Sequence, residues 1–161
     1  MKKTILVILA LSALSFAQQK FACVDPNRIL SESQLVKGKE AQLKAKVEEY
    51  QKQLDQINKR LEELKKQIES KGIAQNVREQ RIKEYQKVEA EGMELQQKAQ
   101  KELSDMKGKM EDEIISRVKN ISEDISKKQG FTGVLDCSAF LYRSAEIDIT
   151  REVIQRLDQQ K

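Results

Sequence analysis

One charged, proline-free stretch, residues 39–129, constrains the fold of this chain more than any other feature. In its first half, apolar residues recur at alternating steps of four and three, at Leu43, Val47, Tyr50, Leu54, Ile57, Leu61, Leu64 and Ile68. This heptad spacing holds over about four heptads and is typical of a coiled coil. The charged residues between the apolar ones are expected to form the solvated faces of the helix.

The repeat stops in the segment Glu69–Asn76, which predicts the turn between two helices. Gly72 is expected at the C′ position of the first helix, where glycine is favoured, and polar residues surround it. A second helical stretch then runs to about Gln129 and is expected to end at Gly130. Two antiparallel helices of this kind share a narrow apolar seam and have no core of their own. The hairpin therefore needs a base, which must come from the two ends of the chain.

The N-terminal end contains a short apolar run, Phe21–Val24, that predicts a strand. Asp25 and Pro26 follow it, and these residue types are favoured as the N-cap and the first residue of a helix. The sequence therefore predicts a short helix over Asn27–Ser33.

At the C-terminal end the charges thin out, and two further strands are predicted at Gly133–Cys137 and Phe140–Tyr142, with a tight turn at Ser138 and Ala139. With Phe21–Val24 they would form a sheet of three short strands at the open end of the hairpin. Such a sheet is marginal alone and its edges are exposed, so oligomerisation is expected. A last helix is expected after a cap at Asp148 or Thr150, with Val153, Ile154 and Leu157 on its apolar face.

Residues 1–17, MKKTILVILALSALSFA, are predicted to be a secretory signal peptide, because two lysines precede an apolar run that ends in small residues. An uncleaved anchor is disfavoured, since the run is shorter than the ~20 apolar residues of a membrane span. A lipoprotein cleavage site at Cys23 is also disfavoured, because Lys20 stands where an apolar residue is wanted. The mature chain is therefore expected to be exported and to begin at Gln18.

The composition argues against an enzyme. The chain has no histidine, which is the commonest metal ligand and the commonest general base near neutral pH. It has no CxxC pair and no glycine-rich phosphate loop, so no catalytic residue, cofactor or metal is expected. Its near-neutral charge gives no nucleic-acid footprint. Cys23 and Cys137 are the only cysteines, and in an oxidising compartment they could form a disulfide or remain two buried thiols.

The excess positive charge gathers near the predicted tip of the hairpin. Residues 59–87 carry nine basic and five acidic side chains, a net charge of +4. Two interpretations stay open: an ordinary solvated helix surface, or attraction of acidic clients or anionic lipid head groups by long-range steering. The basic residues are Lys59, Arg60, Lys65, Lys66, Lys71, Arg78, Arg81, Lys83 and Lys87.

The two ends of the chain, FACVD from Phe21 and GVLDCSAFLYRSAEIDITREVIQRL from Gly133, resemble the Skp family of periplasmic chaperones, also called OmpH-like proteins. In order and length the resemblance covers residues 18–161. It implies an α+β, mainly α fold, in which a long antiparallel helical hairpin stands on a small β body completed by trimerisation. The body would comprise residues 18–38 and 130–161, and the arm residues 39–129, with its tip near 69–76.

The resemblance also implies a function. The chain would be an ATP-independent periplasmic holdase, a homotrimer that binds unfolded outer-membrane β-barrel proteins in a cavity between its arms. Contact with anionic lipid or lipopolysaccharide is a separate expectation that depends on the basic tip. A structural coiled-coil spacer or adaptor of the cell envelope is the alternative. The cysteines depart from the family pattern, in which apolar or small residues stand at such strand positions. The residues expected in the trimer body are Phe21, Val24, Val134, Leu135, Phe140 and Tyr142.

Overall fold

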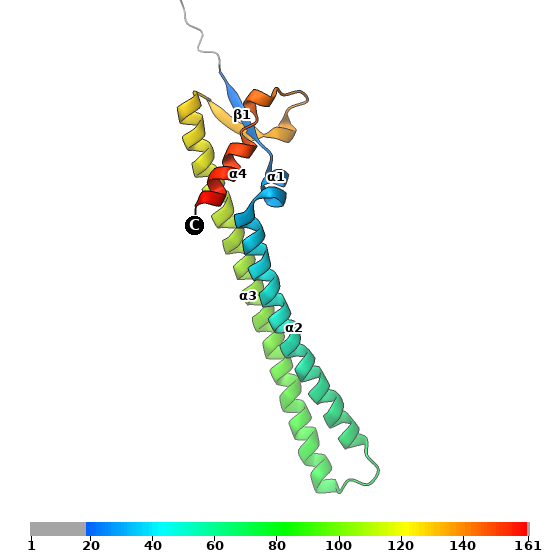
Figure 1. Ribbon diagram of the computed structural model, residues 1–161. Helices are drawn as coiled ribbons and strands as arrows, with labels where there is room; N and C mark the ends of the chain where they lie inside the picture. The colour runs from blue at the N-terminus through cyan, green and yellow to red at the C-terminus, as the bar shows by residue number, and fades with distance from the viewer. Residues whose placement is uncertain (1–18, 161) are drawn as a thin grey trace, which may run out of the picture.

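The computed structural model describes residues 19–160, so the predicted signal peptide lies outside the described residues. Figure 1 shows a long two-helix arm, with both ends of the chain gathered at one end of it in a small body. The elements in chain order are β1 (Phe21–Val24), α1 (Pro26–Glu32), α2 (Gln34–Glu69), α3 (Gln75–Gln129), β2 (Gly133–Asp136), the 3-10 turns η1 (Cys137–Ala139) and η2 (Ala145–Ile147), and α4 (Thr150–Gln159).

The arm consists of α2 and α3, which lie side by side and antiparallel (Figure 1). The predicted seam is confirmed for most of its length, since Tyr50 and Leu64 of α2 are buried, as are Val88 and Ala99 of α3. Val47 is the exception, because 45% of its surface is exposed. The neighbouring Lys46 side chain is less exposed, and its Nζ lies 5.1 Å from the centre of the Tyr50 ring.

The tip differs from its prediction in one respect. The helix α2 ends at Glu69, and its cap residue Ser70 has an extended backbone. Gly72 does not take the left-handed conformation of a C′ residue, so that prediction was wrong. The Arg78 guanidinium instead donates a hydrogen bond to the Ser70 carbonyl oxygen, at 3.2 Å, at the end of α2. Gly130 has a φ of 73° and ends α3, as predicted.

The sheet has two parallel strands, with Phe21 opposite Gly133 and Val24 opposite Asp136. The predicted third strand at Phe140–Tyr142 was wrong. Asp136 accepts a hydrogen bond from the Ser138 N–H at 2.8 Å and starts the 3-10 turn η1, which leads the chain away from the sheet. The other edge of β1 contacts the segment before α4, where the Ile149 N–H donates to the Cys23 carbonyl oxygen at 3.0 Å.

The core lies in the body and at the root of the arm. It draws on β1, α1, the root of α2, the last turns of α3, and α4, and so both ends of the chain contribute to it. The predicted last helix is confirmed as α4, but its predicted cap was wrong, because the N-cap residue is Ile149 and no side chain makes a cap hydrogen bond. The Asp148 carboxylate accepts from the Thr150 N–H at 3.0 Å just before the helix. The buried apolar residues of this core are Ala22, Val24, Ile29, Val36, Ile114, Ile121, Ile125, Ile149, Val153, Ile154 and Leu157.

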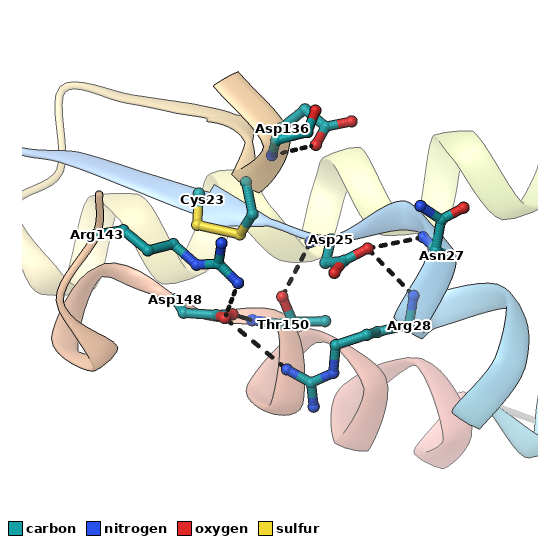
Figure 2. The surroundings of a disulfide bond; sticks show 10 residues. Cys23, Asp25, Asn27, Arg28, Asp136, Arg143, Asp148 and Thr150 are labelled. Atoms are coloured by element: carbon teal, nitrogen blue, oxygen red, sulfur yellow. Dashed lines mark hydrogen bonds and ion pairs between the residues drawn. A yellow bond between two sulfur atoms is a disulfide. The ribbon is translucent and has the colours of Figure 1, made fainter. Parts of the chain in front are cut away.

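A disulfide joins the two strands of the body. Cys23 of β1 and Cys137, the residue after β2, are bonded, and both are buried. Figure 2 shows the bond beside the Asp148 carboxylate, which faces Arg143 and Arg28. Of the two states that the sequence left open, the structure has the bridge. It ties together residues 114 positions apart in the sequence.

A carboxylate from the C-terminal helix caps the long arm helix. Asp158 of α4 accepts hydrogen bonds from the Ser33 hydroxyl at 2.6 Å and from the backbone N–H groups of Gln34 and Leu35 at 3.2 and 3.1 Å. These N–H groups belong to the first turn of α2, where an anion is favoured. Burial alone would raise the pKa of Asp158, but these hydrogen bonds outweigh it and hold the pKa below its ordinary value.

We predict that the denatured, non-reduced protein contains no titratable thiol. Replacing Cys23 and Cys137 together with alanine should lower the free energy of unfolding by about 4–5 kcal/mol, because the unfolded chain gains the entropy of a very long loop. Urea unfolding of both proteins at equal concentration measures the difference. An unchanged midpoint would show that the bridge contributes nothing to stability.

We also predict that Asp158→Ala costs about 1–2 kcal/mol of stability, since it leaves the cap hydrogen bonds unmade. The folded pKa is depressed, so the contribution is complete above the unfolded pKa of about 3.9 and is lost as the pH falls through the folded pKa. Urea unfolding at several pH values should therefore show the two proteins converging in acid. Asp105→Ala, at an exposed position on α3, is the control and should behave as wild type.

Candidate functional site

The body exposes apolar side chains that the chain itself does not cover. The exposed fractions are 38% for Phe21, 45% for Leu135, 86% for Tyr142, and complete for Leu141. Several exposed apolar residues on one small body make it a candidate interaction surface. We call these four residues the body surface.

The residues predicted for the trimer body divide between core and surface. Val24 is buried in the core of its own chain, whereas Phe21, Leu135 and Tyr142 are exposed. Val134 and Phe140 are partly buried, and Val134 packs against the core. Among residues 19–160, β2 pairs only with β1, so its other edge has no strand beside it. An unpaired edge beside exposed apolar residues is suited to pairing with another chain.

The disulfide region resembles a metal site at first sight. One ligand atom each of Cys23, Cys137 and Asp148 lies within 4.8 Å of the other two. The two sulfur atoms are bonded to each other, however, and the Asp148 carboxylate already faces Arg143 at 3.4 Å and Arg28 at 3.8 Å. Burial tends to raise the pKa of Asp148, but the Thr150 hydrogen bonds and the two arginines hold it below its ordinary value. The cluster therefore supports the fold of the body.

The nine basic residues predicted near the tip are not equivalent. Arg60 and Arg81 both bind Glu84, at 2.7 and 2.8 Å, and they lower the pKa of that carboxyl. Arg78 holds the Ser70 carbonyl oxygen, and Lys87 lies 3.9 Å from Glu91. The other five are exposed and have no ion-pair partner within the described part of the chain. They are Lys59, Lys65, Lys66, Lys71 and Lys83.

The arm has two unlike flanks, a feature that the sequence analysis missed. One flank carries ion pairs between α2 and α3, and we call it the ion-paired flank; it contains Lys39–Glu113, Lys46–Glu102 and Arg60–Glu84. The Tyr50 hydroxyl also donates to Glu102, and this hydrogen bond lowers the pKa of Glu102.

The other flank contains a shallow groove of about 310 Å³, which we call the arm groove. Its apolar lining comes from Leu54, Ile57 and Leu61 of α2 and from Met93 of α3, with Gly92 between the helices. A Cβ on Gly92 would lie 3.1 Å from Ile57 Cγ2, so the helices approach closely here. Glycine within a long helix and a methionine beside it, off the seam, were the sequence signals for this groove. Its more polar lining comprises Gln51, Asn58, Glu89 and Gln96.

None of the helices within residues 19–160 has both the length and the apolar character to span a membrane.

Comparison with known proteins agrees with this architecture. The family model for outer membrane protein (OmpH-like) matches residues 20–157. An uncharacterized protein of Aquifex aeolicus (strain VF5) is 36% identical over 158 residues, which cover 98% of this chain and 97% of that protein.

A solved structure has the same fold. It is the crystal structure of a candidate outer membrane chaperone (OmpH-like) from Caulobacter crescentus CB15. It superposes with a TM-score of 0.78 at 21% identity and covers 89% of this chain and 86% of its own. The match of the family model over most of the chain, together with this fold, shows that the protein belongs to the OmpH-like outer membrane protein family.

Proposed function

We propose that the protein is an exported, homotrimeric holdase, which keeps unfolded outer-membrane proteins soluble between its arms without ATP. The observation that carries the proposal is the body surface: apolar side chains on β1, β2 and the following loop are exposed in the single chain. Membership of the OmpH-like family supports the proposal, as does the chaperone role suggested for the Caulobacter relative.

The body surface supports assembly for a physical reason. A two-stranded sheet is marginal in water unless further strands or a partner cover it. Pairing the open edge of β2 and burying Leu135, Leu141 and Tyr142 against neighbouring chains would stabilise the body and place several arms around one space. Segment Phe140–Tyr142, which is not a strand in the single chain, is the natural candidate for pairing with a neighbour.

The arms suit reversible holding of an unfolded chain. Only the root of each arm contributes to the core, and the remainder is a pair of helices with one narrow seam. Its middle and tip present polar surface, exposed lysines and a shallow groove, which offer many weak contacts to a chain without fixed structure. The alternative, a spacer of the cell envelope, would instead keep its arm surface against a fixed partner.

A direct test is whether a stoichiometric amount of the mature protein keeps a urea-denatured outer-membrane β-barrel protein soluble after dilution, followed by light scattering. We expect scattering to be suppressed at about one trimer per client, with no nucleotide added. Undiminished aggregation would exclude the holdase and favour the spacer.

We predict that Leu135→Asp separates the subunits. The residue is half exposed in one chain, so aspartate is tolerated there, but in the proposed trimer it would bury an unpaired charge. Sedimentation should show monomers, and light scattering should show weakened protection of the client. Ile115→Asp is the matched control, because Ile115 is also an exposed apolar residue but lies on α3 outside the body surface. A trimeric Leu135→Asp protein would contradict the assembly proposed here.

We predict that the exposed tip lysines accelerate capture of acidic clients. Replacing Lys65, Lys66, Lys71 and Lys83 with glutamine should slow binding at low salt and have little effect at high salt, where exposed charges are screened. Arg60, Arg78 and Arg81 are left intact, because they bind Glu84 and Ser70 within the arm. Stopped-flow fluorescence at two salt concentrations measures the capture rate.

A charge-matched control distinguishes tip position from total charge. Glutamine at Lys44, Lys101, Lys109 and Lys119 removes the same charge from exposed positions nearer the body. If both quadruple variants capture the client at the same rate in low salt, the tip has no special part in steering.

A further inference from the structure

We infer that the arm groove is a binding site for an extended apolar segment of an unfolded polypeptide. The inference rests on the proposed holdase function and goes beyond it, because it assigns client contact to one flank of the arm. The groove lies midway along the arm, between α2 and α3, and is distinct from both the body surface and the tip lysines.

The first argument is the contrast between the flanks. On the ion-paired flank, charged side chains of α2 and α3 bind one another across the seam, so they have little capacity left for a ligand. Across the groove, within residues 19–160, no ion pair links the two helices. Leu54, Ile57 and Leu61 are only partly buried there, and Met93 is 58% exposed.

The second argument is the shape. Gly92 has no side chain, and the space that a Cβ would occupy is limited by Ile57 Cγ2 at 3.1 Å. The missing side chain lets the two helices approach closely, and Gly92 and Met93 both line the shallow groove at this point. Methionine is flexible and polarizable, and surfaces that bind many different apolar partners use it for this reason.

The third argument is the chemistry of the polar lining, which selects the occupant. Three of its side chains are neutral amides, Gln51, Asn58 and Gln96, and each is exposed. An amide side chain both donates and accepts hydrogen bonds, which matches the alternating N–H and C=O groups of an extended backbone. Gln51 donates one amide hydrogen to Asp55 at 2.8 Å, which leaves its carbonyl oxygen and its second amide hydrogen available to a peptide backbone.

Other occupants fit less well. The one charged side chain of the groove is Glu89, which disfavours an anionic lipid head group or phosphate. Contacts to backbone groups and to an apolar floor do not depend on a particular sequence. They also resist salt, in contrast to contacts made by the tip lysines. The groove therefore suits the apolar part of an extended, unfolded chain.

The test uses the full mature protein with a fluorescently labelled, urea-denatured outer-membrane β-barrel protein as the probe. Met93→Gln replaces an exposed apolar side chain with an amide of similar length, and Ile115→Gln is the matched control on the same helix but outside the groove. Release is followed after adding an excess of unlabelled client. We expect Met93→Gln to release the client roughly three- to tenfold faster, with an unchanged capture rate, and Ile115→Gln to match wild type.

A second measurement identifies the occupant directly. Both native cysteines are in the disulfide, so a cysteine introduced as Gln96→Cys can be labelled selectively with a photocrosslinker. Crosslinks to the client are expected at this position, and Ile115→Cys should give few. Crosslinks from Gln96→Cys to a neighbouring arm, unchanged by added client, would assign the groove to a second copy of the chain and overturn the inference.

The outcomes separate this inference from the proposed function. If wild type holds the client but the Met93 and Ile115 variants release it equally, the groove is not a client site and the holdase proposal stands. If wild type does not hold the client at all, the holdase proposal fails and this inference fails with it.

Discussion

The packing of α4 into the root of the arm is the interaction on which the rest of the structure depends. A two-helix hairpin buries only a stripe along each helix, and this stripe cannot fix how the open end is arranged. The α4 residues Val153 and Leu157 are fully buried in one cluster with Val36 of α2 and Ile125 of α3. Asp158, on the same helix, caps the first turn of α2. One short amphipathic helix thus joins both arm helices to β1 and gives the arm a defined direction.

The sequence predicted the elements whose signals are local. The heptad seam, the Asp25–Pro26 helix start, the Gly130 stop and the apolar face of α4 all follow from residue type and spacing, and the structure has each of them. The third strand was wrong because hydrogen bonding by the Asp136 side chain, a local competitor of the ladder, turns the chain after β2. The Asp148–Ile149 contact with Cys23 depends on long-range packing and has no local signal.

The sequence also predicted only those parts of the candidate site that have a local signal. Counting charges located the basic tip, but only the register between α2 and α3 shows that Arg60 and Arg81 share Glu84. Predicting the two flanks of the arm also requires that register. The sequence of one helix does not show which of its basic residues lie opposite acidic residues of the other helix. One flank of the arm carries ion pairs, and the other carries amides and exposed apolar atoms. The arm therefore differs in polarity between its two flanks as well as between its buried seam and its solvated faces.

The parallel pairing of β1 with β2 has a consequence for the order of folding. Phe21 pairs with Gly133, and the whole hairpin lies between them in the sequence, so the sheet is a highly non-local contact. Helical hairpins form from local contacts and are fast, whereas distant strand pairing is slow until its ends are brought near each other. The hairpin is therefore expected to form first and to act as a template that returns the C-terminal strand to the N-terminal one. If the chain is exported as proposed, β1 emerges before β2 and has no partner strand until the arm has formed, and pairing of Cys23 with Cys137 is then expected to follow formation of the arm.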